Sequence, residues 1–218
     1  HAGPEISVAS TKAYMVQLAV FYLLAFRLSY VRGAITEEQC MSYTEKLLGI
    51  PELIEKILEK PETCQFAASR LVADEHLLYI GRGLDYALSM EGSLKLKEIS
   101  YIHSESYAAG ELKHGTISLI TEDMPVIAVA TQRDVLDKTV SNIKEVKSRG
   151  AFTIVVTREG TDFDKDVADI LVTVPETDDL LMPMTAVVPL QLIAYYTADL
   201  RGNDVDKPRN LAKSVTVE

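Results

Sequence analysis

Cysteine is scarce in this chain of 218 residues. Only Cys40 and Cys64 are present. Both lie in segments that we predict to be helical, and neither has the C-x-x-C or histidine spacing of a zinc or redox centre. Isolated cysteines of this kind are typical of cytosolic proteins, in which they stay reduced. We therefore expect no metal site, no redox cofactor and a cytoplasmic location.

An excess of positive charge is also missing. Lysine and arginine number 22 against 32 for aspartate and glutamate, so the formal net charge is −10 at pH 7. A general nucleic-acid binder carries a basic patch, so we expect no nucleic-acid partner. The charge does not exclude a small phosphorylated ligand, because a phosphate group needs only a few local positive groups.

Long apolar runs are absent as well. The most apolar segment is Leu18–Phe26, which Gln17 and Arg27 flank. A membrane span needs ~20 apolar residues, so this segment is too short. A helix that is apolar on all sides is more often buried in a large core. We expect no membrane span, and we expect a core that includes surface from outside this chain.

Nucleotide-binding motifs are incomplete or missing. Gly81-Arg82-Gly83 follows a predicted strand, but Tyr86 stands where a dinucleotide fingerprint has its third glycine. The P-loop and the nucleophile elbow are also absent. We therefore expect no nucleotide cofactor.

From residue 76 onward, short β-branched runs alternate with helical segments. This alternation predicts an α/β fold with a mostly parallel sheet that helices cover on both faces. The strands are expected at 76–81, 125–131, 151–157 and 169–174, with a shorter one near 116–120, and the helices at 85–102, 135–149 and 184–201. Before this region we expect a long helix from Ala13 to Arg32, capped by Ser10, and two or three amphipathic helices within 36–73.

A stripe of charged residues marks the helix expected at 85–102. Glu91, Lys95 and Glu98 are spaced i, i+4, i+7, so they lie within about 60° of one helix face. A solvated face with i,i+4 ion pairs is the ordinary explanation for such spacing. However, the helix follows a strand through a Gly-Arg-Gly turn, and open α/β sheets bind ligands at the carboxyl ends of their strands. The stripe is therefore a candidate site.

The segment 203–218 has few helix signals and carries Lys207, Arg209 and Lys213. Most C-terminal segments of this kind are solvated. Apolar residues at positions 211, 215 and 217 predict instead that the segment is anchored to the protein.

Several blocks of this sequence closely resemble the isomerase domain of the glucosamine-6-phosphate synthase family, also called glutamine–fructose-6-phosphate aminotransferases (isomerising). The blocks are Ala2–Ile6, Val8–Ala13, Gly81–Gly83, Glu91-Gly92, Leu94–Tyr101, Ala108–Gly115, Asp204–Asp206 and Pro208–Glu218. The resemblance covers essentially the whole chain, and its last block is highly specific.

The resemblance implies a domain organisation. The isomerase half of the family consists of two flavodoxin-like sugar-isomerase (SIS) subdomains. Residues 1–33 would be the terminal loop and helix of the first subdomain, 34–202 the second subdomain, and 203–218 an ordered tail over the active site. The glutaminase domain of the family and the Ser/Thr-rich loop that holds most of the phosphate have no counterpart in this sequence.

The resemblance also implies a reaction. The family converts fructose 6-phosphate and glutamine to glucosamine 6-phosphate and glutamate without a redox cofactor. Glu98 would be the base that moves a proton from C1 to C2, Lys213 would form an imine with the open sugar, and His114 would open the ring from the neighbouring subunit of a homodimer. The other implied site residues are Val8, Ser10 and Ala212 at the sugar-phosphate pocket, Glu91 and Lys95 near the reacting carbons, and Arg209 and Leu211 near an ammonia channel.

Two other functions remain open. An SIS module can sense a sugar phosphate without catalysis, and a related deglycase cleaves amino-sugar phosphates. A sensor needs neither Glu98 nor Lys213, and the terminal segment Lys213–Glu218 favours the synthase over the deglycase.

Overall fold

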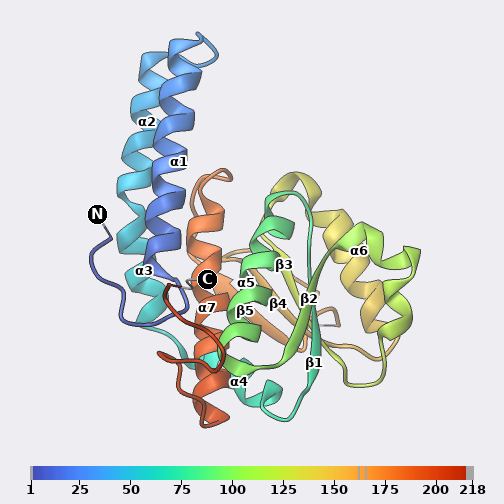
Figure 1. The fold of residues 1–218 in the computed structure, drawn as a ribbon. Helices are drawn as coiled ribbons and strands as arrows, with labels where there is room; N and C mark the ends of the chain where they lie inside the picture. Colours follow the sequence, from blue (N-terminus) through green and yellow to red (C-terminus); the bar gives the residue numbers. More distant parts are fainter. Residues whose placement is uncertain (1, 162, 165, 215–218) are drawn as a thin grey trace.

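The computed structural model describes residues 2–161, 163–164 and 166–214 (Figure 1). At its centre lies a parallel sheet with the strand order β2-β1-β3-β4-β5. This is the flavodoxin-like order, so the expected α/β fold is confirmed. The strands are β1 (His76–Gly81), β2 (His103–Ala108), β3 (Pro125–Ala130), β4 (Phe152–Arg158) and β5 (Ile170–Val174).

The central strands form where the sequence is richest in β-branched residues. All residues of β3 are buried, and β4 is buried from its second residue onward. Apolar runs of this kind are typical of parallel strands that are covered on both faces. The four strands expected at 76–81, 125–131, 151–157 and 169–174 are all present, with bounds that differ by one residue at most.

The strand expected near 116–120 was wrong. Residues Thr116–Leu119 form a 3₁₀ helix, η2, which follows another, η1 (Ala109–His114). The fifth strand is β2, which has the polar sequence His-Ser-Glu-Ser-Tyr-Ala and pairs with β1 at the edge of the sheet. An edge strand tolerates polar side chains, so hydrophobic periodicity does not reveal it.

Helices cover both faces of the sheet. The helices α4 (Glu62–Leu71), α5 (Leu84–Ser100) and α7 (Met182–Leu200) share one core with alternate strand residues such as Tyr79 and Ile127. On the other face, α6 (Leu136–Lys147), preceded by η3 (Arg133–Val135), packs with η1 over the intervening strand residues. The two separate cores follow from the alternation of side chains along a strand.

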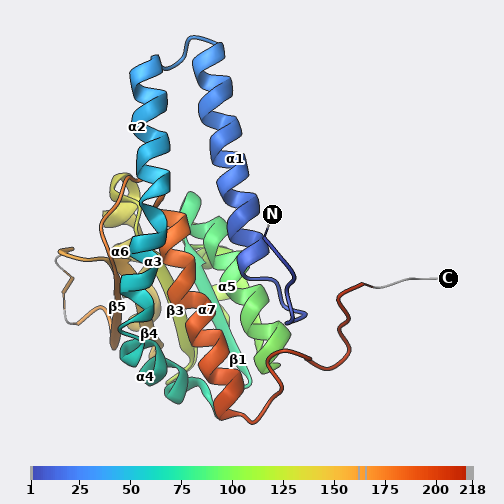
Figure 2. The ribbon, with the colours of Figure 1, turned by 90° about the vertical axis from the view of Figure 1, so that its left-hand side faces the viewer.

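The helices α1 (Lys12–Val31) and α2 (Glu37–Leu48) form a long hairpin that projects from the sheet domain (Figure 2). Thr36 and Gln39 form a capping box at the start of α2. The helix α3 (Ile50–Leu58) follows, and a small core that includes Phe26 and Met184 fixes the hairpin to α7.

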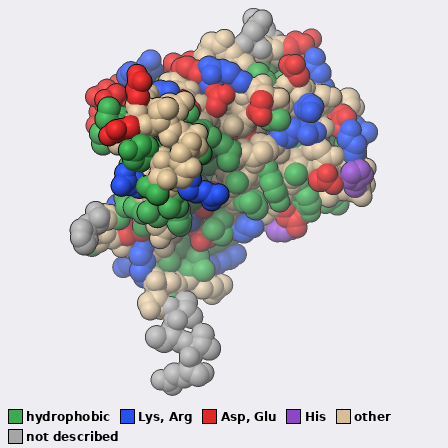
Figure 3. Space-filling model, turned by 90° about the horizontal axis from the view of Figure 1, so that it is seen from above, with side chains coloured by type: hydrophobic (Ala, Val, Ile, Leu, Met, Phe, Trp, Pro, Cys, Tyr) green, Lys and Arg blue, Asp and Glu red, His purple; other side chains and the backbone are tan. Residues whose placement is uncertain are grey.

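Much of the apolar surface of α1 is exposed. Phe21, Leu28 and Val31 are each about 60% exposed or more, and Figure 3 shows hydrophobic side chains gathered on this side of the molecule. By length and composition, α1 is the one helix of the described residues that would be able to cross a membrane. This is weak evidence for a span, because a helix that another part of a longer protein covers has the same composition.

The turn from β1 into α5 has no room for a side chain at Gly81. A Cβ atom there would lie 2.5 Å from the carbonyl group of Asp85 and 2.7 Å from the backbone nitrogen of Tyr86. Because these are backbone atoms, α5 would have to move away from the sheet. The sequence Gly-Arg-Gly therefore sets the distance between β1 and the helix that carries the charged stripe.

We predict that Gly81→Ala lowers the free energy of unfolding by about 1–3 kcal/mol, the usual range for overpacking. Urea unfolding followed by circular dichroism measures this change. Gly49→Ala is the matched control, because a Cβ atom at Gly49 would meet its nearest neighbour at 3.5 Å, and we expect no loss of stability from it. Equal urea midpoints for Gly81→Ala and the wild type would contradict the prediction.

Candidate active site

The charged stripe of α5 has a buried lysine between two partly buried glutamates. The Nζ atom of Lys95 donates a hydrogen bond of 2.6 Å to Oε2 of Glu98 and lies 3.8 Å from Oε1 of Glu91. The side chains of Lys95, Glu91 and Glu98 are only 5%, 12% and 22% exposed, respectively. A solvated helix face is therefore excluded, and the expectation that these three residues share one face is confirmed.

Burial and charge act together on the stripe. Burial raises the pKa of Glu91, an effect that the Lys95 ammonium opposes and the Glu98 carboxylate reinforces. Tyr14 of α1 lies close enough to respond, since burial and the charge of Glu91 both raise its pKa. Glu98, whose carboxylate the Lys95 ammonium holds in this partly enclosed site, is placed as a group that takes up and returns a proton would be.

The stripe does not lie at the carboxyl ends of the strands. That position, between β1 and β3, holds the buried carboxylate of Asp85 at the start of α5. Asp85 accepts hydrogen bonds from the backbone nitrogens of Thr131 (2.7 Å) and Gln132 (3.1 Å) and from the Thr131 hydroxyl (2.6 Å). Burial raises the pKa of Asp85, although these bonds and the charge of Arg158 oppose the shift. The stripe lies further along α5.

The tail and the N-terminal loop run side by side. The backbone nitrogen of Val8 donates to the carbonyl of Asp206 (2.9 Å). The ammonium of Lys213 donates to the carbonyl of Ser7 (2.8 Å) and to Oε2 of Glu5 (3.1 Å). The structure thus brings Lys213 to the loop that contains Val8 and Ser10. Ala212, like Lys213, is exposed.

Glu5 is a site residue that the sequence did not reveal. Its carboxylate accepts hydrogen bonds from the backbone nitrogen of Thr11 (2.9 Å) and the hydroxyl of Ser10 (3.3 Å) at the start of α1. The N-cap residue of α1 is Thr11, without a side-chain cap, so the expected cap by Ser10 was wrong. No residue spacing signals that a glutamate six positions upstream satisfies a helix terminus and also pairs with the tail.

A cavity of about 210 Å³ connects these elements, and we call it the Lys95 cavity. Its lining comes from the N-terminal loop and the start of α1 (Ser7, Ala9, Thr11), α5 (Lys95, Ile99), α7 (Gln191, Tyr195) and the tail (Val205, Asp206). The loop, the stripe and the tail therefore meet at one place. Gln191, inside an apolar stretch of α7, was also missed, because its hydrophobic neighbours indicate only core packing.

Two tail residues differ in their contacts. Arg209 donates from its backbone nitrogen to the hydroxyl of Tyr101 (2.8 Å), and its guanidinium lies 4.1 Å from the centre of that ring. Leu211 is 44% exposed, so its expected role as an apolar anchor was wrong. The other two expected anchors, Val215 and Val217, lie outside the described residues.

His114 lies at the end of η1, and its ring nitrogen Nδ1 is 2.9 Å from Oε2 of Glu111. Both side chains are more than two-thirds exposed. The Lys95 cavity does not include His114, so the structure does not bring this residue to the stripe of its own chain.

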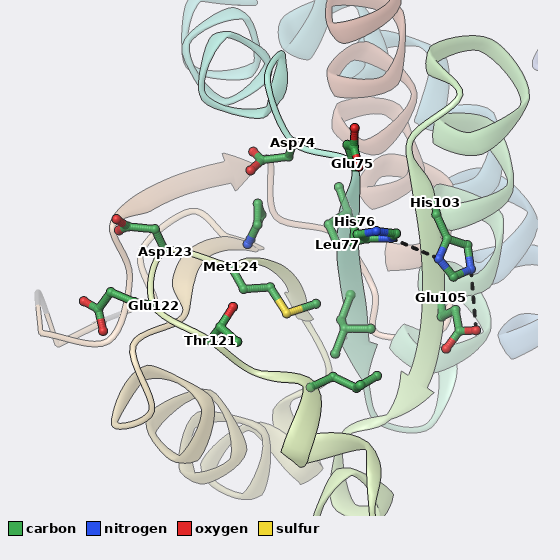
Figure 4. A pocket seen from close by; sticks show the side chains of 13 residues that line it. Asp74, Glu75, His76, Leu77, His103, Glu105, Thr121, Glu122, Asp123 and Met124 are labelled. Carbon is green, nitrogen blue, oxygen red and sulfur yellow. Dashed lines mark hydrogen bonds and ion pairs between the residues drawn. The ribbon is translucent and has the colours of Figure 1, made fainter.

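Another cavity, of about 560 Å³, lies at the opposite, amino-terminal edge of the sheet (Figure 4). His76 and His103 face each other there, with their Nδ1 atoms 3.3 Å apart. None of the site residues expected from the sequence lines this cavity. The size of this cavity alone therefore does not make it the candidate site.

The described residues contain no group of three or more His, Cys, Asp or Glu arranged to hold a metal ion. Burial raises the pKa of the Cys64 thiol to about 12. A thiol that stays protonated is a poor nucleophile and a poor metal ligand.

Comparison with known proteins gives the family. Residues 70–200 match the model of the SIS domain. The chain belongs to the SIS domain family. It is 51% identical over 217 residues to the glutamine–fructose-6-phosphate aminotransferase (isomerizing) of Clostridium acetobutylicum and 53% identical over 218 residues to that of Clostridium tetani. Both comparisons cover the whole of this chain. The chain spans only 36% of the length of each relative, in its C-terminal part.

A solved structure agrees with this result. The C-terminal domain of the glucosamine-fructose-6-phosphate aminotransferase from Francisella tularensis matches with a TM-score of 0.88 and 38% identity. The match covers 94% of this chain and 58% of that structure. The expected SIS fold is thus confirmed, together with the resemblance to the isomerase domain of this enzyme family.

The ion pair between Glu5 and Lys213 gives a pH-dependent prediction. Burial by itself raises the pKa of Glu5, but the Thr11 N–H and the Lys213 ammonium hold it below its usual 4.5. A carboxyl group whose pKa is lowered by folding stabilises the folded state at any pH above the pKa that the group has in the unfolded chain. This stabilisation is lost as the pH falls through the pKa of the folded state.

We therefore predict that Lys213→Met raises the pKa of Glu5, measured by NMR titration of its side-chain carboxyl carbon. Lys207→Met removes a charge from the same tail but not from this pair, so it serves as the control and should leave the pKa unchanged. An unchanged pKa in Lys213→Met would show that the pair does not form in solution.

Proposed function

We propose that this chain is the C-terminal part of the isomerase domain of a glutamine–fructose-6-phosphate aminotransferase, which makes glucosamine 6-phosphate from fructose 6-phosphate and ammonia. The observation that carries the proposal is the buried Lys95–Glu98 pair, next to the loop and tail that hold Lys213. The relatives that are about half identical over the whole chain support the same reaction.

In this proposal the reaction begins with the opening of the sugar ring. His114 exchanges a proton with the anomeric oxygen, because histidine is the side chain that most often serves as a general acid or base. The neutral amine of Lys213 then attacks the C2 carbonyl of the open sugar, and water leaves as the imine forms. Before this step the ion pair of Lys213 with Glu5 must separate and the ammonium must lose a proton, since an ammonium has no electron pair with which to attack.

Ammonia then displaces the lysine amine, which leaves an imine at C2. The Glu98 carboxylate removes a proton from C1 and returns it to C2, while the proton of the C1 hydroxyl passes to the imine nitrogen. C1 thereby becomes an aldehyde, and C2 carries the amino group. One base that reaches both carbons is sufficient for this transfer. The hydrogen bond from Lys95 holds the carboxylate of Glu98 in place.

The chain provides only part of such an enzyme. The proposed arrangement is residues 1–33 as the end of the first SIS subdomain, 34–202 as the second, and 203–218 as a tail over the active site. The rest of the first subdomain would cover the exposed face of α1 and hold most of the substrate phosphate. A glutaminase domain of the same enzyme would supply ammonia, which passes Arg209 and Leu211 on its way to the sugar.

The proposed assembly is a cytoplasmic homodimer in which each subunit offers His114 to the active site of the other. Two features support this assembly. The side chain of His114 is 69% exposed, and η1 holds it away from the Lys95 cavity of its own chain. An isologous dimer would bring both histidines into reach through one symmetric interface.

Catalysis is favoured over the two alternatives. A sensor of sugar phosphates would gain nothing from a buried ammonium–carboxylate pair beside the ligand, because desolvating both groups costs free energy. A deglycase would use a base such as Glu98, but it would not need the amine of Lys213 at the N-terminal loop.

We predict that Glu98→Gln in the full-length protein lowers the rate of glucosamine 6-phosphate formation by about 10²–10⁴-fold, the usual contribution of a general base. Glutamine keeps the shape of the side chain but cannot accept the C1 proton, so the affinity for fructose 6-phosphate should change little. Turnover assays and calorimetric titration measure the two quantities. Glu52→Gln on the exposed surface of α3 is the control, and near wild-type turnover by Glu98→Gln would reject Glu98 as the base.

Lys213 should form a covalent imine with fructose 6-phosphate in the full-length protein. Borohydride reduction in the presence of the sugar phosphate should give a hexose-phosphate adduct, which peptide mass spectrometry should map to Lys213. Lys213→Arg keeps the positive charge but cannot form the imine, so it should lose both the adduct and the activity. An adduct on another lysine, or full activity of Lys213→Arg, would reject Lys213 as the imine-forming residue, and the tail would then only cover the site.

A further inference from the structure

Gln191 on α7 carries a buried polar group without a partner. Its Nε2 atom is enclosed, and among the described residues nothing accepts a hydrogen bond from it. Burying an unsatisfied donor destabilises the folded state. The flanking residues Val188, Leu190 and Ile193 are buried and apolar, so an apolar side chain at 191 would avoid this cost. A group outside the protein chain is needed to explain the amide.

Lys95 on α5 also has N–H donors without a hydrogen-bond acceptor. An ammonium carries three N–H donors, and the hydrogen bond to Glu98 uses one of them. Glu91 lies 3.8 Å away, which is too far for a hydrogen bond. Its Oε1 atom is likewise enclosed and unpartnered within the described part of the chain. With only 5% of the Lys95 side chain exposed, bulk water does not supply the missing partners.

Lys95 and Gln191 both line the Lys95 cavity, so a molecule inside the cavity can bind both side chains. Its volume of about 210 Å³ far exceeds the ~10–15 Å³ that a single water needs. A buried water also needs two to four polar partners. Lys95 and Gln191 supply two donors, and Thr11 and Asp206 are further polar residues of the lining. Ordered water therefore fits the cavity in size and in hydrogen bonding.

We propose that Gln191 is a positioning residue for the base Glu98, acting through ordered water in the Lys95 cavity. The water accepts hydrogen bonds from Gln191 and from the Lys95 ammonium, and so fixes the direction of the N–H group of Lys95 that holds Glu98. This inference rests on the function proposed above, because it assigns a role within the same reaction.

The geometry makes Glu98 sensitive to this arrangement. The Lys95 ammonium is the group that holds the Glu98 carboxylate through a hydrogen bond of 2.6 Å. If the ammonium turns toward the cavity or toward Glu91, the carboxylate loses its fixed position relative to C1 and C2. A misplacement of 1 Å at a reacting group costs about 10²-fold in rate.

The test uses Gln191→Met in the full-length protein, since methionine has a similar volume but no donor. We expect kcat to fall about tenfold or more, with an unchanged KM and an unchanged Tm, because methionine fills a similar volume in the packing of α7. Gln191→Glu should lower kcat further, because a carboxylate there draws the Lys95 ammonium away from Glu98.

Thr197→Val is the matched control on the same helix. The hydroxyl of Thr197 donates within α7, to the carbonyl of Ile193 (2.7 Å), and the residue does not line the cavity. Its kcat should stay at the wild-type value. If Gln191→Met keeps full kcat, or if its loss of activity follows a loss of Tm or a rise in KM, Gln191 is only a structural residue and the proposal is wrong.

A crystal structure of the full-length protein separates this proposal from the proposed function. We expect a water within about 3 Å of both Nε2 of Gln191 and Nζ of Lys95. A dry cavity, or water bound to only one of the two, would overturn the inference whatever the activity. A wild-type protein that makes no glucosamine 6-phosphate would reject the proposed function instead, and the water would still decide whether Gln191 and Lys95 are linked.

Discussion

The rest of the site depends on the ion pair between the buried ammonium of Lys95 and the carboxylate of Glu98. Removing an ammonium from water costs several kcal/mol, and only close carboxylates and further hydrogen bonds offset this cost. Glu98 supplies the close contact, and Glu91 adds a more distant charge. The pair remains buried because α7, the N-terminal loop and the tail close around it.

The helix α5 connects this pair to the sheet. Its first turn is fixed by the close approach at Gly81 and by Asp85, which ties it to the end of β3. Asp85 also fills the position at which many α/β folds bind an anion, so the stripe further along the helix is left as the chemical surface. The sheet therefore acts as a rigid support, and the charged stripe lies on the helical layer above it.

Two surfaces of this chain are open in the structure. The apolar face of α1 is exposed over much of its length, and an isolated soluble protein rarely exposes such a continuous patch. The N-terminal loop and the tail leave the side chain of Lys213 accessible to solvent, with 47% of its surface exposed. Both observations agree with a chain that spans 36% of its curated relatives.

The sequence by itself determined the local structure and the pattern of the stripe. Runs of β-branched residues predicted four strands within one residue, and i, i+4, i+7 spacing placed Glu91, Lys95 and Glu98 on one face, because both signals depend only on near neighbours. The edge strand β2 escaped this reasoning, since its polar sequence shows no apolar alternation.

Only the tertiary structure decided which charges are buried and which distant residues meet. The pairing of Lys213 with Glu5 joins residues 208 positions apart, and the unpartnered amide of Gln191 becomes visible only when α7 packs against α5. Burial and long-range contact arise from the packing of whole elements, which the spacing of residues along one segment does not encode.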